Sequence, residues 1–219
     1  RVVAGLDPCA ALQTVVKILP GETISVTCML GETASKEDVR SIVYSYRDEL
    51  QVSGALEQTK LWWDEKLGVI EVETPELSTN FMVNRWLLYQ NLSCRIWGRS
   101  GFYQSSGAYG FRDQLQDSTS LIYAYPSLAR SHIIKAAGRQ FREGDVQHWW
   151  HPPAGDGVRS RISDDLLWLP FAVAQYIGVT GDSSILEEKV AWLDAPLLKE
   201  DQHEIIQQPS VTQENDTIF

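Results

Sequence analysis

Hydrophobic and polar residues change their spacing along the chain, and each change predicts a different element. Two β-branched runs, "TVVKIL" (14–19) and "TISVTCML" (23–30), alternate at period two on either side of "PGE". A Pro-Gly turn between such runs predicts an antiparallel pair of strands. Because a lone hairpin is not stable by itself, we interpret the pair as the last strands of a larger sandwich.

From residue 35 the apolar residues fall at helical spacing. The run "SKEDVRSIVYSYRDEL" (35–50) has Ser35 as its expected N-cap, with Asp38 three residues later. A second helix is predicted over roughly 55–67. A long aromatic helix is predicted from Leu77 to Gly98, and its apolar composition indicates burial on most sides.

The second half of the chain predicts further helices joined by long loops. Helices are expected at 112–124, at 126–142 with Pro126 at its start, and from Asp164 to about 179, closed by "TGD". The segment 143–163 is expected to be a long loop. One or two short helices are expected after the helix that ends near 179, and the end of the chain is expected to be a loop. "DQHEIIQQP" (201–209) fits a polar strand or a substrate loop. The predicted fold class is mainly α, a toroid of paired helices preceded by a little β-structure.

Composition limits the classes of function. A formal charge of −10 on 219 residues argues against a nucleic-acid groove or an anionic membrane surface. No apolar run is long enough to cross a bilayer, and no signal peptide pattern is present. The three scattered cysteines, Cys9, Cys28 and Cys94, indicate small core residues in a reducing compartment, so a cytoplasmic location is expected.

Aromatic residues are abundant, with eight tryptophans and eight tyrosines. Core packing is the ordinary use of such side chains. The alternative is stacking on sugar rings, because the C–H face of a pyranose packs well on an indole.

Charged pairs stand at the starts of two expected helices. In "FRDQLQD" (111–117), Asp113 and Asp117 share a helix face beside Arg112, and the set offers donors and acceptors for sugar hydroxyls. A solvated helix N-terminus explains the same acids equally well. In "SDD" (163–165), Ser163 is the expected N-cap of the next helix. An aspartate there acts as a general acid only if burial or a neighbouring anion raises its pKa.

The loop between these helices is the stronger signal of a binding site, because long loops are enriched in such sites. Two histidines three residues apart without a third ligand do not predict a metal site. The candidate binding residues of the loop are Gln147, His148, Trp149, Trp150, Arg159 and Arg161.

Three runs resemble a known family. They are "LDPCAALQ", "LYQNLSCRIWGRSGFYQSSGAYGFRDQLQD" and "QHWWHPPAGDGVRSRISDDLLWLPFAV". They are similar to the inverting β-glycoside phosphorylases of glycoside hydrolase family 94. Within that family, they most resemble the branch of cellobionic acid phosphorylase, 1,2-β-oligoglucan phosphorylase and the C-terminal region of cyclic β-1,2-glucan synthase.

The resemblance implies three parts. Residues 1–34 would end a β-sandwich domain, 35–72 would form a helical linker, and 73–219 would form the first part of an (α/α)6 barrel. The remaining helices and the phosphate-binding residues would lie outside this chain. We therefore expect a fragment that is inactive alone and exposes an apolar face, covered by self-association into a homo-oligomer or by the rest of the barrel.

The resemblance also implies a mechanism without a cofactor, in which inorganic phosphate is a co-substrate and Asp164 donates a proton to the leaving oxygen of a β-glucoside. Arg112, Asp113 and Asp117 would hold the glucose unit that is cleaved off. The neighbouring subsite would be shaped by His148, Trp149, Trp150, Arg159 and Arg161, and the full set of binding residues includes Gln147 and Asp165.

Two other readings stay open: a carbohydrate-binding fragment without catalysis, and an inverting hydrolase, for which no water-activating carboxylate is identified. The substrate is open between β-1,2-glucan and a cellobionic acid or cellobiose-like glucoside. Arg159 and Arg161 hint at an acceptor that carries a carboxylate.

Overall fold

The computed structural model describes residues 11–33, 35–99 and 106–218. The chain divides into two compact units, Arg1–Trp63 and Asp64–Phe219, which are described separately. Cys9 lies outside the described residues, as do residues 100–105 of the run "LYQNLSCRIWGRSGFYQSSGAYGFRDQLQD".

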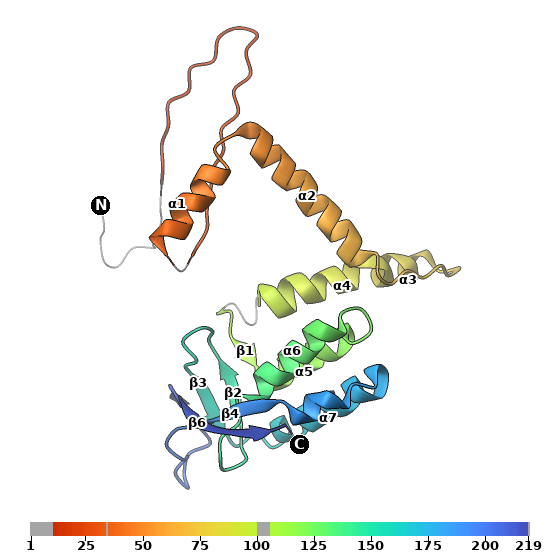
Figure 1. The fold of residues 1–219 in the computed structure, drawn as a ribbon, viewed down its shortest axis with the longest axis vertical. Helices are drawn as coiled ribbons and strands as arrows, with labels where there is room; N and C mark the ends of the chain where they lie inside the picture. The colour runs from red at the N-terminus through yellow and green to blue at the C-terminus, as the bar shows by residue number, and fades with distance from the viewer. Residues whose placement is uncertain (1–10, 34, 100–105, 219) are drawn as a thin grey trace. The chain divides into compact units, whose positions relative to one another are not determined.

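The first unit begins with two extended arms joined by a turn (Figure 1). The turn lies at Pro20–Gly21, where Glu22 N–H donates to the Leu19 carbonyl at 3.0 Å and Gly21 has a φ of +83°. The expected turn is therefore confirmed. The expected strands are not, because residues 11–33 contain no strand. A hairpin is stable only when its side chains pack on a further sheet or helix, and these side chains have no further sheet to pack on.

Two helices complete the first unit: α1 (Lys36–Ser45) and α2 (Glu49–Leu67), whose last residues enter the second unit. Ser35 Oγ accepts a hydrogen bond from Asp38 N at 3.1 Å and donates to Asp38 Oδ2 at 2.7 Å. The predicted N-cap is thus confirmed. Helix α2 starts earlier than predicted, and Asp48 Oδ1 accepts from Leu50 N at its start.

The helix predicted over 77–98 is interrupted. It consists of α3 (Leu77–Phe81), the π-helix η1 (Met82–Trp86), α4 (Leu87–Gln90) and the π-helix η2 (Asn91–Trp97). Asn84 and Arg85 leave helical geometry, Arg85 with a φ of +72°. The Asn84 amide accepts from Val72 N at 2.8 Å and donates to Val72 O at 2.9 Å. This pairing with an extended segment satisfies Val72 and provides a physical reason for the break.

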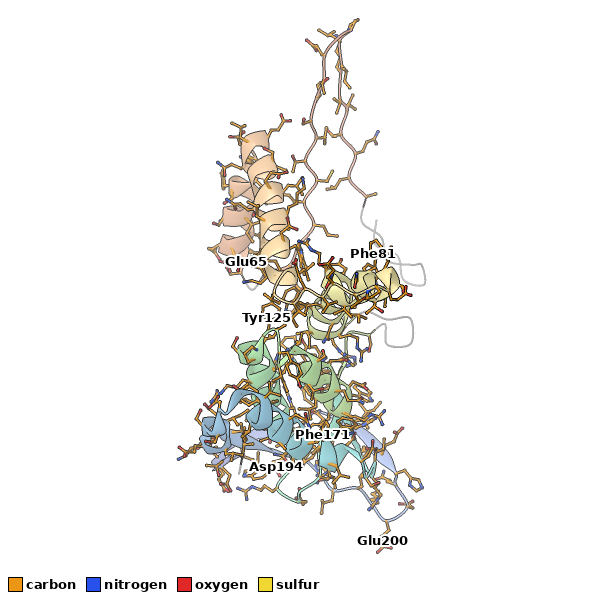
Figure 2. The ribbon with its side chains drawn as sticks, turned by 90° about the vertical axis from the view of Figure 1, so that its right-hand side faces the viewer. Glu65, Phe81, Tyr125, Phe171, Asp194 and Glu200 are labelled. Atoms are coloured by element: carbon orange, nitrogen blue, oxygen red, sulfur yellow. The ribbon has the colours of Figure 1, made fainter. Side chains whose placement is uncertain are left out.

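The prediction that this segment is buried on most sides is wrong for the described chain. Leu92 and Ile96 are buried, whereas Phe81 is 77% exposed and Trp86 51% exposed. Helix α7 (Asp165–Thr180) also exposes apolar side chains, including Phe171, which Figure 2 labels together with Phe81. Both segments therefore expose apolar side chains.

Three helices form the core of the second unit. Helices α5 (Phe111–Leu121), α6 (Pro126–Ala137) and α7 pack against one another (Figure 1). Phe111, Leu115 and Ile133 are fully buried between them. Each such side chain stabilises the fold by roughly 1.5–3 kcal/mol relative to exposure. Gly181, with a φ of +73°, caps the end of α7 and confirms the predicted stop.

Two small antiparallel sheets complete the unit. One contains, in order, β1 (Tyr109–Gly110), β2 (Gln147–Trp150), β3 (Gly157–Ser160) and β5 (Glu204–Gln207). The other pairs β4 (Lys189–Asp194) with β6 (Ser210–Thr217), after a short 3-10 helix η3 (Ser183–Glu187). The loop predicted over 143–163 is therefore partly a hairpin, and the predicted terminal loop is partly strand. "EIIQ" is the polar strand that the sequence left open.

The hairpin forms because glycine allows a close approach. A Cβ on Gly157 would lie 1.9 Å from the Trp149 carbonyl oxygen and 2.7 Å from Trp150 Cα. No other residue fits this position without displacing β2.

In the described part of the chain, no helix is both long and apolar enough to cross a membrane.

Candidate functional site

The two charged motifs of the sequence meet where α5 and α7 begin. Gly110 is the N-cap of α5, and the two helices are in contact. The N-cap of α7 is Asp164 and not Ser163 as predicted, because α7 begins one residue later, at Asp165. Arg112 Nη1 donates a hydrogen bond to Asp164 Oδ2 at 3.0 Å across 52 residues of sequence. Asp113 folds back over Gly110, where a Cβ would lie 2.6 Å from its Oδ2. The structure thus brings Arg112, Asp113 and Asp164 together.

The Asp164 carboxylate is held in its charged form. Its side chain is 47% exposed, and the hydrogen bond from Arg112 lowers its pKa below the ordinary value, with a smaller contribution from Trp168. The same bond raises the pKa of Arg112. In this state Asp164 is a hydrogen-bond acceptor and not a proton donor.

A second acid–base pair lies beside the first. Asp165, the first residue of α7, is 1% exposed, and its Oδ2 lies 2.7 Å from His148 Nδ1 on strand β2. This hydrogen bond raises the pKa of His148, against the opposing effect of burial. Asp113 and Arg112 act on the same imidazole electrostatically, so His148 belongs to the same charged group.

Asp117 has other partners. Its Oδ2 accepts from Arg95 Nε at 2.9 Å and lies 3.5 Å from Arg99 Nη1. Burial raises the pKa of Asp117, and the two arginines oppose that effect. Asp117 therefore ties α5 to η2 and to the chain that follows it.

The remaining residues of strand β2 divide between core and surface. Gln147 is 1% exposed, and its Nε2 donates to the Gly155 carbonyl at 2.8 Å. Trp150 is also buried, with its ring centroid 5.8 Å from that of Tyr109. Trp149 is only partly buried. Of the three, Trp149 is the side chain that keeps exposed surface.

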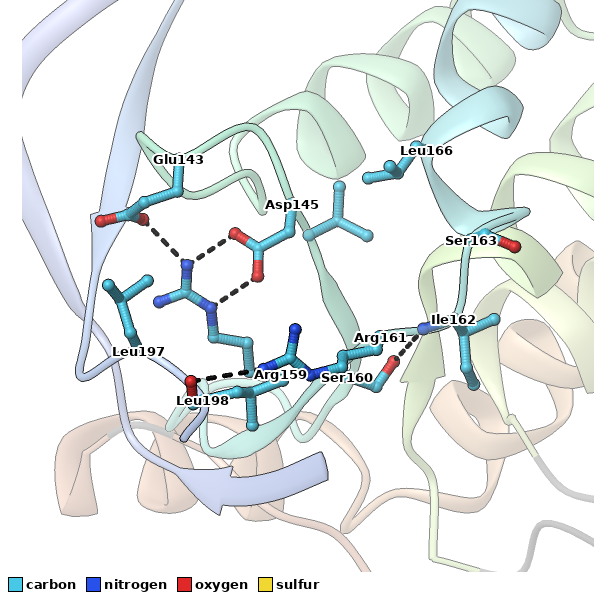
Figure 3. A pocket seen from close by; sticks show the side chains of 11 residues that line it. Glu143, Asp145, Arg159, Ser160, Arg161, Ile162, Ser163, Leu166, Leu197 and Leu198 are labelled. Carbon is cyan, nitrogen blue, oxygen red and sulfur yellow. Dashed lines mark hydrogen bonds and ion pairs between the residues drawn. The ribbon is translucent and has the colours of Figure 1, made fainter. Parts of the chain in front are cut away.

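Arg159 is buried in a closed set of hydrogen bonds. Its Nε and Nη2 contact both carboxylate oxygens of Asp145 at 2.6 Å, and Nη2 also contacts Glu143 at 2.9 Å (Figure 3). Nη1 donates to the carbonyls of Ala195 and Pro196 at 3.0 and 3.4 Å. A guanidinium has five N–H donors, and five contacts account for all of them.

Arg161 is exposed, but it also binds backbone. Its Nε donates to the Gln202 carbonyl and its Nη2 to the Lys199 carbonyl, both at 2.9 Å. Arg159 and Arg161 line a pocket of about 360 Å³ with Ser163 and Leu166, the residues on either side of the aspartate pair (Figure 3). A space of this size is at the small end of the range of small-molecule pockets.

Several residues of this region were not predicted from the sequence. Trp168 contributes a hydrogen bond to Asp164, and its spacing of four residues on α7 is a signal that helical periodicity provides. Asp145 and Glu143 hold Arg159 and carry no comparable signal. Cys28 is exposed, so it is not the core residue that was expected. Within the described ranges, no three His, Cys, Asp or Glu side chains gather as metal ligands.

Comparison with known proteins places this arrangement in a family. Residues 62–207 match the model of the glycosyl hydrolase 94 superfamily catalytic domain, and residues 1–49 match the supersandwich domain of the same family. The chain is 47% identical over 213 residues to the cyclic beta-(1,2)-glucan synthase NdvB of Rhizobium meliloti (strain 1021), covering 97% of this chain and 8% of that protein.

Two phosphorylases are more distant relatives. The chain is 27% identical to the N,N'-diacetylchitobiose phosphorylase of Vibrio furnissii, over 85% of this chain and 26% of that protein. It is 29% identical to the solabiose phosphorylase of Paenibacillus borealis, over 86% of this chain and 23% of that protein. The chain thus spans about a quarter or less of these three relatives. It belongs to the glycosyl hydrolase 94 superfamily of glycoside phosphorylases.

Proposed function

We propose that this chain supplies the proton donor and part of the sugar site of an inverting β-glucoside phosphorylase. The observation that carries the proposal is the 3.0 Å contact between Arg112 and Asp164, inside the region that matches the family's catalytic domain. Helices α5, α6 and α7 would belong to an (α/α)6 barrel that a polypeptide of the relatives' length completes. Activity is proposed for that longer polypeptide.

The proposed reaction needs one acid and one phosphate. Asp164 transfers its proton to the glycosidic oxygen as the bond from that oxygen to the anomeric carbon breaks. A phosphate oxygen forms the new bond to the anomeric carbon from the opposite face, which gives α-glucose 1-phosphate and the shortened glucoside. Phosphate takes the place of water, so no protein base is required. Arg112 and Asp113 would hold hydroxyl groups of the glucose unit.

Proton donation requires that the pKa of Asp164 rises. Arg112 lowers the pKa of Asp164. A glucose hydroxyl that takes over the Arg112 hydrogen bond would weaken that effect, and exclusion of water by the sugar would disfavour the charged carboxylate. Both changes raise the pKa of Asp164. A phosphate dianion nearby acts in the same direction, because a second negative charge favours the neutral acid.

Two observations favour β-1,2-glucan over cellobionic acid as the substrate. All five N–H donors of Arg159 are already engaged, and Glu143 and Asp145 line the same pocket, so Arg159 is not free to bind a carboxylate. The similarity to a cyclic beta-(1,2)-glucan synthase points to the same linkage. A neutral glucosyl unit therefore suits this pocket better than an acidic one.

The proposal is tested with a polypeptide that contains this chain within a full-length catalytic domain. It is incubated with β-1,2-glucan or cellobionic acid, each with and without phosphate, and glucose 1-phosphate is measured. We expect product from β-1,2-glucan only when phosphate is present, and its loss in Asp164→Asn. Asp156→Asn, in the neighbouring hairpin, is the control and should keep the activity. Free glucose released without phosphate would identify a hydrolase and refute the proposal.

A further inference from the structure

The pairing of Asp165 with His148 has no role in the proposed proton transfer. It begins with an irregularity in strand β2. Gln147 pairs with Arg159 and Trp149 with Val158, so His148 stands opposite no residue of β3. Such bulges re-aim a side chain, and they are frequent beside active sites. Here the imidazole reaches the first turn of α7.

Because Asp165 is buried, its carboxylate depends on the contact with His148. Asp165 is 1% exposed, and a buried carboxylate is stable only when a charged or hydrogen-bonding group compensates for lost water. His148 Nδ1 at 2.7 Å from Oδ2 is that group. Asp165 Oδ1 is buried and has no hydrogen-bond partner among the described residues. The contact of His148 with Oδ2 therefore compensates the carboxylate for the lost water. This requirement favours a protonated imidazole.

The surroundings of the imidazole determine what it would bind. From α7 it faces Asp165, with Asp164 next along the helix, and from α5 it faces Asp113 and Arg112. On β3 the charged residue, Arg159, is engaged by Asp145 and Glu143, and β1 carries no charged residue. Three carboxylates against two cations leave the group negative overall. This charge suits the hydroxyl groups of a neutral sugar as the partner of His148.

The ring retains access to a ligand. His148 Nδ1 is used by Asp165, which leaves Nε2 for another partner, and 27% of the side chain is exposed. We infer that Asp165 is a positioning residue that holds His148 in its charged form. His148 then donates an Nε2–H hydrogen bond to a hydroxyl oxygen of the sugar unit bound by Arg112 and Asp113. The inference rests on the proposed function, because it concerns the same sugar.

The first test is the titration of His148 in this 219-residue chain by NMR with labelled histidine. The chain has four histidines, and His148→Gln assigns the signal. We expect His148 to titrate above the ordinary histidine range and to titrate lower in Asp165→Asn. Asp156→Asn is the matched control, because Asp156 lies 3.2 Å from His151 in the same hairpin, outside the charged group. An unchanged His148 titration in Asp165→Asn would overturn the inference.

The second test uses the longer polypeptide and a β-1,2-linked glucose disaccharide. Binding should shift the His148 signal. His148→Ala should lower kcat/KM by about 10- to 100-fold, as expected for a lost hydrogen bond from a charged donor, and His148→Gln should restore part of it. In Asp165→Asn the alkaline limb of the pH profile should move to lower pH, whereas Asp156→Asn should leave it in place.

The two proposals fail in different ways. If glucose 1-phosphate forms but the Asp165→Asn profile equals that of Asp156→Asn, the positioning role is wrong and the phosphorylase stands. If no variant forms glucose 1-phosphate, the proposed function is wrong. The disaccharide-induced shift of His148 then decides the inference, since its presence supports sugar binding and its absence refutes it.

Discussion

Replacing Arg159 by alanine should destabilise the second unit far more than replacing Arg161. Arg159 is 1% exposed, makes five hydrogen bonds and lies over the Phe141 ring at 3.9 Å. Breaking a fully buried charge pair costs about 3–5 kcal/mol. The partners here, Asp145 and Glu143, are 30% and 44% exposed, so water would compensate partly. We therefore expect a loss of about 3 kcal/mol, at the lower end of that range.

Arg161→Ala is the matched control, because this exposed side chain binds mainly backbone carbonyls. Its cost should stay below about 1 kcal/mol. For a chain of this length, 3 kcal/mol lowers Tm by roughly 6–12 °C. Thermal unfolding followed by circular dichroism, with urea midpoints as a second measure, compares the two variants. Equal losses in the two variants would refute the assignment of Arg159 as a structural centre.

The pH dependence of stability provides a second test of the role of Arg159. Arg159 lowers the pKa of Glu143 below its ordinary value of 4.5. A lowered pKa of an acid contributes stability that is present above the unfolded value and is lost as the pH falls through the folded value. The difference in stability between the wild type and Arg159→Ala should therefore shrink below about pH 4.5. A difference that grows in acid would contradict the pairing.

Three further predictions concern stability and are checked by unfolding experiments. Gly157→Ala should destabilise the hairpin by about 1–3 kcal/mol or more through its clash with β2, whereas Gly178→Ala, in open space on α7, should be neutral or stabilising by up to about 1 kcal/mol. Burial lowers the pKa of His132 to about 4, so the chain should lose stability as the pH falls from 6.5 to 4, and His132→Gln should flatten this slope. Hydrogen bonds from Ser184 and then Tyr176 lower the pKa of Asp182 to about 2, so their stabilisation should be present above pH 3.8 and lost towards pH 2, a slope absent in Asp182→Asn.

Local signals in the sequence predicted local structure well. The Ser35 cap and the Gly181 stop depend on residues within a few positions, and both are confirmed. The break at Asn84 was missed because it depends on Val72, twelve residues away. Strands β2 and β3 were missed because the sheet needs the close approach at Gly157 and also β5, which lies more than forty residues later.

In the candidate site, too, the sequence predicted local features and not contacts between distant residues. Charged residues at two helix starts were visible in the sequence, and their grouping came from the family resemblance. The spacing of 52 residues between Arg112 and Asp164 does not predict their contact, which depends on how α5 and α7 pack. The loop arginines are the clearest difference. Charge in a loop indicated substrate binding, whereas the structure commits Arg159 to Asp145 and Glu143.

The most direct test of the central claim measures Asp164→Asn on two leaving groups. A polypeptide with the full-length catalytic domain is given phosphate and either β-1,2-glucan or a dinitrophenyl β-glucoside, and α-glucose 1-phosphate is followed over time. An acidic phenol leaves without a proton, so a general acid at Asp164 matters only for the glucan. We predict that Asp164→Asn loses at least 10²-fold in rate on the glucan and little on the aryl glucoside. Equal losses on both substrates would contradict proton donation by Asp164.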